Sequence, residues 1–211
     1  MNSGYLSLVL MVVTLILFAS GWKDSISRGI TNKVILLFFV SWIIGMKFPL
    51  VFAFGQCSPI ILLLCLVIIG ALWRAHGQMY RLHLISIGIL LGSVTFFMLE
   101  ALHLVPFLVI INQDTSIALV VALLVSFMTR NTAVQIAVAS MGLLIGETYY
   151  RYLHREHIGF QLGNLAFQDR WWLTVFLARG ISLVLAGIVT SCKKSIQWII
   201  QGIRRRSGGR E

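Results

Sequence analysis

Five ionisable residues lie inside or at the ends of long apolar runs: Lys47, Glu100, His103, Glu147 and Arg179. A charged side chain at the centre of a bilayer costs about 2.5–3.5 kcal/mol on insertion scales, so each of these residues needs a reason to be there. The two glutamates balance Lys47 and Arg179 in formal charge. We therefore predict an outward-facing polar pocket with Arg179 as its floor, paired to Glu147 or Glu100. The alternative is a structural salt bridge that fixes helix order, with the shallower charges reaching the headgroups.

Metal and catalytic chemistry have little support in the sequence. Glu100 and His103 form an E-x-x-H motif on one helix face, but a di-metal carboxylate bundle needs two such motifs and two further glutamates. His154, His157 and Glu156 suit a solvated loop better than a surface metal site. The chain lacks H-E-x-x-H, G-x-S-x-G, P-loop and G-x-G-x-x-G motifs. We therefore expect no metal, no cofactor, no catalytic residue and no enzymatic activity.

The apolar runs that carry these residues predict an all-α, polytopic transmembrane helix bundle. The chain of 211 residues is 58% apolar and only 11% charged, whereas a soluble domain carries about 25% charged residues. The runs are continuous rather than alternating, which favours helices over a β-barrel. We predict about seven spans, at residues 5–20, 34–51, 60–73, 82–104, 117–128, 133–150 and 171–190.

The distribution of basic residues predicts the orientation of the spans. With the N-terminus outside, twelve Lys and Arg fall in inner segments and four in outer segments, so the positive-inside rule indicates N-out and C-in. A six-span arrangement, with the fifth span misread, is the alternative. The net charge of +10 is then explained by topology and anionic lipid rather than by nucleic acid. These observations place the protein in a membrane, with most of its basic residues on the inner side.

One domain is expected, a transmembrane bundle over residues 1–192 followed by a basic tail over residues 193–211. The tail has isoleucines at helical spacing between lysines and arginines. This pattern indicates a short helix lying on the inner leaflet and held by anionic lipid. A stop-transfer anchor with a frayed end is the alternative. No protein partner can be assigned from these features.

Four glycines form two G-x-x-x-G motifs, which are Gly88 with Gly92 and Gly142 with Gly146. Small residues four apart let helices approach closely in lipid, so we predict that both motifs are packing seams.

The junction before the last span holds an acid and two indoles. We expect Asp169 to cap the seventh helix and Trp171 and Trp172 to mark the outer interface. The preceding loop, residues 151–170, is either a lid or a linker.

Two short segments carry a family resemblance. At Gly142–Glu147 (G-L-L-I-G-E) and Gly163–Asp169 (G-N-L-A-F-Q-D) the chain resembles the YphA-type membrane proteins of endospore-forming Gram-positive bacteria. The resemblance implies a small multi-spanning protein of a bacterial plasma membrane and supplies no catalytic residue. Hypotheses about the function therefore rest on the intramembrane charged residues. A small transporter or ligand-binding bundle is the first hypothesis, and a non-catalytic scaffold or assembly factor is the alternative.

Overall fold

Runs of Leu, Ile, Val and Phe form most of the helices in the computed structural model. The structure describes residues 3–21, 31–47, 50–52, 55–104, 112–155 and 161–207. Within those residues it contains seven helices, so the fold is all-α apart from one small sheet. They are α1 (Tyr5–Ala19), α3 (Asn32–Lys47), α4 (Pro59–Arg74), α5 (Gln78–Leu104), α6 (Gln113–Met128), α7 (Thr132–Leu153) and α9 (Leu165–Ser207).

The small sheet was not predicted from the sequence. Strands β1 (Leu50–Phe52) and β2 (Gly55–Cys57) form an antiparallel hairpin, and β3 (Gln161–Leu162) pairs with β2 in parallel. The second predicted span, 34–51, is therefore shorter than expected, because its helix ends at Lys47 and the chain turns into β1. Pro49, which has no N–H to donate, follows that helix end. The β2–β3 pairing also anchors the described end of the 151–170 loop; residues 156–160, which bear on the lid question, lie outside the described residues.

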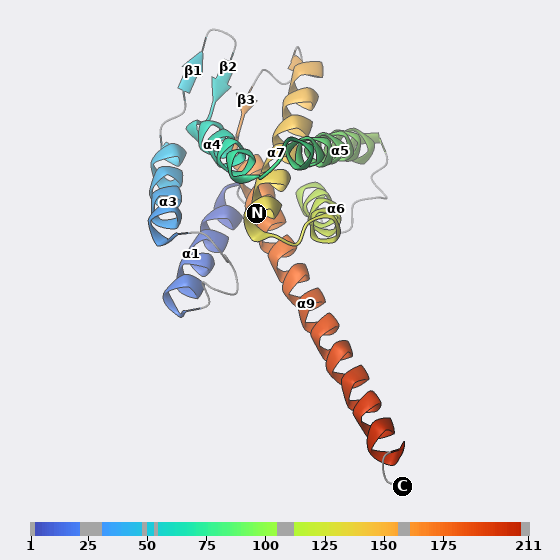
Figure 1. Ribbon diagram of the computed structural model, residues 1–211. Coiled ribbons are helices and arrows are strands. Elements are labelled where there is room, and N and C mark those ends of the chain that lie inside the picture. The colour runs from blue at the N-terminus through green and yellow to red at the C-terminus, as the bar shows by residue number, and fades with distance from the viewer. Residues whose placement is uncertain are drawn as a thin grey trace.

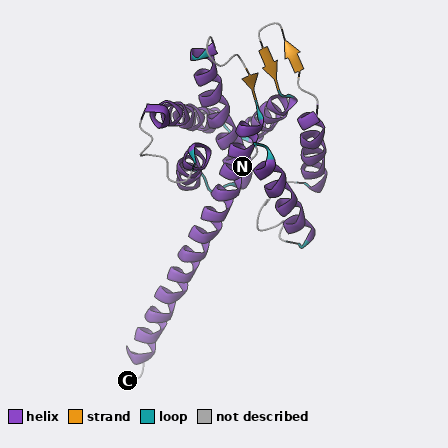
Figure 2. Cartoon of the chain, turned by 180° about the vertical axis from the view of Figure 1, so that it is seen from behind, coloured by secondary structure: helices purple, strands orange, loops and turns teal. Residues whose placement is uncertain are grey.

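Side-chain contacts show the directions of three helices relative to α9. Asp114 contacts Arg170 and Ser126 contacts Ala178, so α6 runs parallel to α9. Gly4 contacts Asp169, and Thr14 and Arg179 line one cavity further along, so α1 also runs parallel to α9. Contacts of Glu147 with Arg170 and of Gln135 with Ser182 show that α7 runs the opposite way. We call the end near β1–β3 the strand end and the opposite end the tail end. Figures 1 and 2 both show α9 extending far beyond the bundle at the tail end.

The two glycine motifs lie at the crossing of α5 and α7. A methyl group added at Gly142 would lie 2.5 Å from Cβ of Leu91, and one added at Gly146 would lie 2.6 Å from Cβ of Thr95. On the other side, a methyl group at Gly92 would lie 2.6 Å from a side-chain carbon of Ile145. The absence of side chains therefore lets the two backbones approach, as expected for small residues at a helix seam.

The last helix differs most from the sequence prediction. It begins at Leu165 rather than at residue 171, because the Asn164 side-chain oxygen accepts the N–H of Phe167 at 2.9 Å. It continues without a break to Ser207. The predicted separate tail helix on the inner leaflet is therefore replaced by a continuation of α9. The sequence from Thr190 to Ile203 has one glycine near its end and no proline to stop the helix.

Helix length varies widely across the bundle, and α7 has 22 residues. Gln78–Leu102 and Leu165–Lys194 are long and apolar enough to cross a membrane. The apolar helices α1, α3, α4 and α6 have 15 or 16 residues, which corresponds to about 22–24 Å at the helical rise. A hydrocarbon core is about 30 Å thick.

Candidate functional site

The most deeply buried acid of the described chain is Glu147, near the strand end of α7. Only 2% of the surface of this residue is exposed to solvent. One carboxylate oxygen accepts the Nε–H of Arg151 at 2.9 Å, one turn along α7, and the other accepts Nη1–H of Arg170 at 2.8 Å. Both oxygens of this carboxylate are therefore engaged by guanidinium groups, as a buried charge requires.

Arg170 extends the pairing to a third helix. It lies in the second turn of α9 and its Nε–H donates to Oδ1 of Asp114 at 2.8 Å. Asp114 is in the first turn of α6, where the helix dipole favours a negative charge. Its side chain is 39% exposed, while that of Arg170 is 7% exposed. We refer to Asp114, Glu147, Arg151 and Arg170 as the charge cluster; its formal charges cancel, and it joins α6, α7 and α9.

The predicted partner of Glu147 was Arg179, and the structure replaces it with Arg170. Arg179 instead donates from Nη1 to Oε1 of Gln135 at 2.9 Å. Gln135 is in the first turn of α7, so it lies twelve residues before Glu147 along one helix, or about 18 Å at the helical rise. The predicted shared pocket is thus divided between the two ends of the bundle, because the residue of α9 beside Glu147 is Arg170, nine residues before Arg179.

Gln135 organises the polar contacts around Arg179. Its amide donates to the backbone oxygen of Thr129 at 2.7 Å and to Oγ of Ser182 at 2.6 Å. With Oε1 accepting from Arg179, a fully buried amide has its oxygen and its nitrogen bonded. This arrangement connects the α6–α7 turn to the middle of α9.

Asp169 caps a helix other than its own. Its two carboxylate oxygens accept the backbone N–H groups of Gly4 at 2.7 Å and of Ser7 at 2.6 Å. These are donors at the N-terminus of α1, which has no capping hydrogen bond from its own Gly4. The prediction that Asp169 caps the seventh helix is therefore wrong, since α9 starts four residues earlier and Asp169 faces α1.

Trp171 and Trp172, which were predicted to mark the outer interface, are both buried inside the bundle. Trp171 stacks on Trp42 with ring centroids 4.8 Å apart, and Trp172 stacks on Phe39 at 5.8 Å. Nε1 of Trp171 donates to Oγ of Ser140 on α7 at 2.9 Å. The aromatic residues of α3 supply the partners, which the position of the indoles next to a charged loop did not reveal.

The remaining predicted pocket residues do not join the charge cluster. Glu100 contacts only His154, with Oε2 and Nε2 3.8 Å apart, among the ion pairs of the described residues. The helix backbone is described at Lys47 and His103, but their side chains lie outside the described residues. No group of three or more His, Cys, Asp and Glu comes together in the described part of the chain.

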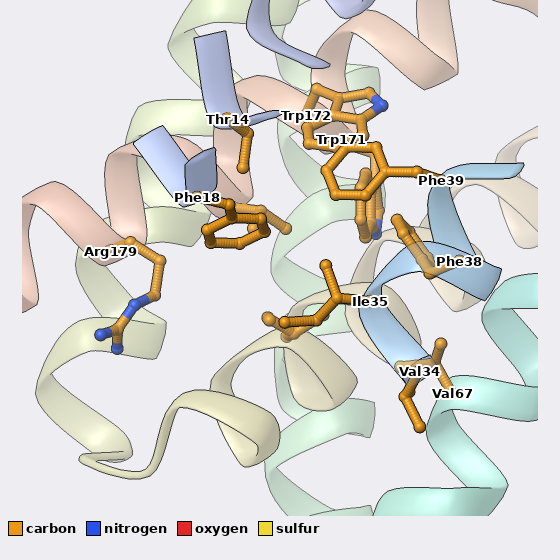
Figure 3. Close-up of a pocket in the computed structure, with 12 residues that line it drawn as sticks. Thr14, Phe18, Val34, Ile35, Phe38, Phe39, Val67, Trp171, Trp172 and Arg179 are labelled. Atoms are coloured by element: carbon orange, nitrogen blue, oxygen red, sulfur yellow. The ribbon is translucent and has the colours of Figure 1, made fainter. Parts of the chain in front are cut away.

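An apolar cavity of about 150 Å³ is lined in part by Trp171 and Trp172. Figure 3 shows the rings of Phe38, Phe39 and Trp171 along one side of it and Arg179 at its edge, with the guanidinium turned away from those rings. The cavity is formed mainly by α1, α3 and α9. Apart from Thr14 and Arg179 its walls are apolar, so they suit an apolar group.

Sequence reasoning missed four polar residues of these sites, namely Asp114, Arg151, Arg170 and Gln135. Asp114 lies near the start of α6 and Arg170 near the start of α9, both at the strand end. The predicted order of spans alone therefore places this acid and this base at the same end of the bundle. Gln135 carries no charge, and its position one turn after a tight loop gives no signal of its contact with Arg179.

Comparison with known proteins identifies the family. No curated protein and no solved structure matches the chain. The family described as YphA-like integral membrane protein matches residues 4–207. Since this match covers nearly the whole chain, the protein belongs to the family of YphA-like integral membrane proteins.

Proposed function

We propose that this integral membrane protein crosses the bacterial plasma membrane seven times, with its strand end outside and its tail end inside. The opposite directions of α6, α7 and α9 support this arrangement, since each of these helices would return the chain to the opposite face. Charge supports it too. The acidic residues of the described chain, Glu100, Asp114, Glu147 and Asp169, are all at the strand end. Arg74, Arg81 and Arg130 are at the tail end, as the positive-inside rule requires.

Four helices are shorter than a typical hydrocarbon core, so this topology requires a locally thin bilayer around the bundle. Thinning is one of the known responses to a hydrophobic mismatch of a few ångströms. The apolar part of α9 exceeds the core thickness and extends past the bundle at the inner side.

We further propose that the protein is a non-enzymatic scaffold or assembly factor. The observation that carries this proposal is the pairing of Glu147 with Arg170 and Arg151 in a buried site. A transport site must expose its polar groups to solvent and release a ligand, whereas these carboxylate oxygens are held by guanidinium groups on two helices. The charges then serve to fix the order of α6, α7 and α9. The chain also has no recognised catalytic motif.

A ligand-binding bundle or small transporter is the second candidate. It is favoured by the apolar cavity between α1, α3 and α9 rather than by the predicted polar pocket. A cavity of about 150 Å³ lined by aromatic rings has the composition of a site for a small apolar group or one end of a hydrocarbon chain.

Complementation of a strain with the disrupted gene separates the two candidates. For a scaffold, Glu147→Gln should lose complementation only to the extent that folded protein is lost from the membrane. Phe39→Ala, which enlarges the apolar cavity, should behave in the same way. Each variant is therefore measured for membrane level and thermal stability beside complementation. A Phe39→Ala protein that is present and folded as wild type but fails to complement would favour the ligand-binding bundle.

A further inference from the structure

A second, larger cavity opens at the tail end of the bundle. It has a volume of about 540 Å³ and lies where the turn between α4 and α5 meets the start of α7. The polar side chains on its walls are Arg74, His76, Tyr80 and Asn131. It shares no wall residue with the charge cluster or with the apolar cavity around Trp171 and Trp172.

The side chains of this cavity give it a positive charge. Arg74 is the last residue of α4, and no residue on the walls is acidic. Arg81 donates from Nε to the backbone oxygen of Ala75 at 3.0 Å, and Gly77 supplies the positive φ of 93° that the turn requires. The acids of the described chain lie at the other end of the bundle, so they do not offset this charge at short range.

The helix start adds a second source of positive potential. Oδ1 of Asn131 accepts the N–H of Ala133 at 3.1 Å and caps α7, and both residues line the cavity. The N-terminus of a helix carries the equivalent of about half a positive charge and attracts anions. A guanidinium, an imidazole and a helix N-terminus therefore face one open space.

The position of the cavity along the membrane normal is marked by Trp73. This side chain precedes Arg74 and is 81% exposed. Indole rings concentrate at the level of lipid headgroups, where one edge is apolar and the other wet. The cavity thus lies at the depth of a headgroup rather than in the hydrocarbon.

We propose that this cavity binds a phosphate group. Arg74 matches two phosphate oxygens with parallel N–H donors, the start of α7 adds positive potential on the facing wall, and His76 offers a ring nitrogen for hydrogen bonding. Tyr80 supplies a hydroxyl at the rim. The phosphate belongs either to the headgroup of an anionic phospholipid or to a small phosphorylated molecule at the membrane surface.

Binding to the purified full-length protein in a neutral detergent tests the proposal. The probes are short-chain phosphatidylglycerol, inorganic phosphate and an uncharged diacylglycerol of the same chain length. Arg74→Gln should weaken phosphatidylglycerol binding about five-fold, since one basic side chain near anionic lipid contributes about that factor. Asn131→Asp keeps an N-cap for α7 but places a carboxylate in the cavity. It should weaken binding about as much or more while the protein stays folded.

The matched control is Lys193→Gln/Lys194→Gln, which removes two exposed charges from α9 outside the cavity. This variant should bind phosphatidylglycerol like wild type. Binding of phosphatidylglycerol alone identifies a lipid headgroup as the source, and competition by inorganic phosphate identifies a soluble phosphorylated molecule. The proposal is overturned if diacylglycerol binds equally well. It is also overturned if Asn131→Asp binds like wild type, or if the lysine control loses as much affinity as Arg74→Gln.

Discussion

Removal of the Glu147 charge should be the most destabilising single change in the charge cluster. Glu147→Gln keeps the shape of the side chain but leaves Arg151 and one side of Arg170 without an anionic partner. Breaking a buried ion pair by removing one partner costs about 3–5 kcal/mol. Arg170 keeps its bond to Asp114, so we expect the lower end of that range, about 3 kcal/mol in the free energy of unfolding.

Reversible unfolding of the purified protein in detergent micelles measures this cost. Trp171 follows Arg170 in the chain and stacks on Trp42, so tryptophan fluorescence reports the loss of this contact. Arg151→Gln is the matched control. In this variant Glu147 keeps its bond to Arg170, so the loss of one charged hydrogen bond should cost only about 1.5 kcal/mol.

A double-mutant cycle makes the reasoning refutable. The Glu147→Gln/Arg170→Gln double variant removes both charges, and Asp114 can then be hydrated because it is partly exposed. The double variant should therefore be less destabilised than the sum of the two single variants, with a coupling of about 1–3 kcal/mol. A cost of Glu147→Gln no larger than that of Arg151→Gln, or additive costs in the cycle, would show that the pair does not hold α7 to α9.

Three further changes test other contacts. Asp169→Ala should cost about 1–2 kcal/mol in the same unfolding assay, because it removes the cap of α1, and Asp169→Asn should recover part of that loss. Gly146→Ala should destabilise the α5–α7 seam by about 1–3 kcal/mol through overpacking, whereas Gly180→Ala has open space and should be neutral or slightly stabilising; equal effects at both glycines would contradict the seam. In intact cells a membrane-impermeant maleimide should label Cys57 and spare Cys192, and the reverse pattern would overturn the orientation. Burial raises the pKa of the Cys57 thiol, so less thiolate is present at neutral pH and its labelling should still increase at about pH 9.

The helices and the glycine seam could be predicted because each depends on local pattern. Apolar runs indicate helices whatever their neighbours are, and four-residue spacing of Gly142 and Gly146 places both on one face. The 50–57 hairpin could not be predicted in this way. Its residues are as apolar as a helix, and the pairing of β2 with β3 joins positions about a hundred residues apart in the chain.

The charge pairs were harder to predict than the charges themselves. Burial of Glu147 followed from its position, but the choice between Arg170 and Arg179 depends on which turn of α9 faces α7. Starting α9 at residue 171 put Arg179 too close to the strand end and treated Asp169 and Arg170 as loop residues. With the helix start at Leu165, both lie on α9 and point to different neighbours, Asp169 to α1 and Arg170 to α6 and α7.

These pairings make the two ends of the bundle electrostatically unlike. At the strand end, the acids and bases of the charge cluster neutralise one another within the protein. Asp169, also at this end, accepts the N–H groups at the start of α1. At the tail end, arginines from separate turns gather beside the start of α7, far from every acid in the described residues. A bundle whose positive end lacks internal compensation lowers its electrostatic energy by facing anionic headgroups. The same asymmetry that supports the orientation of the protein therefore also favours a phosphate in the cavity at Arg74.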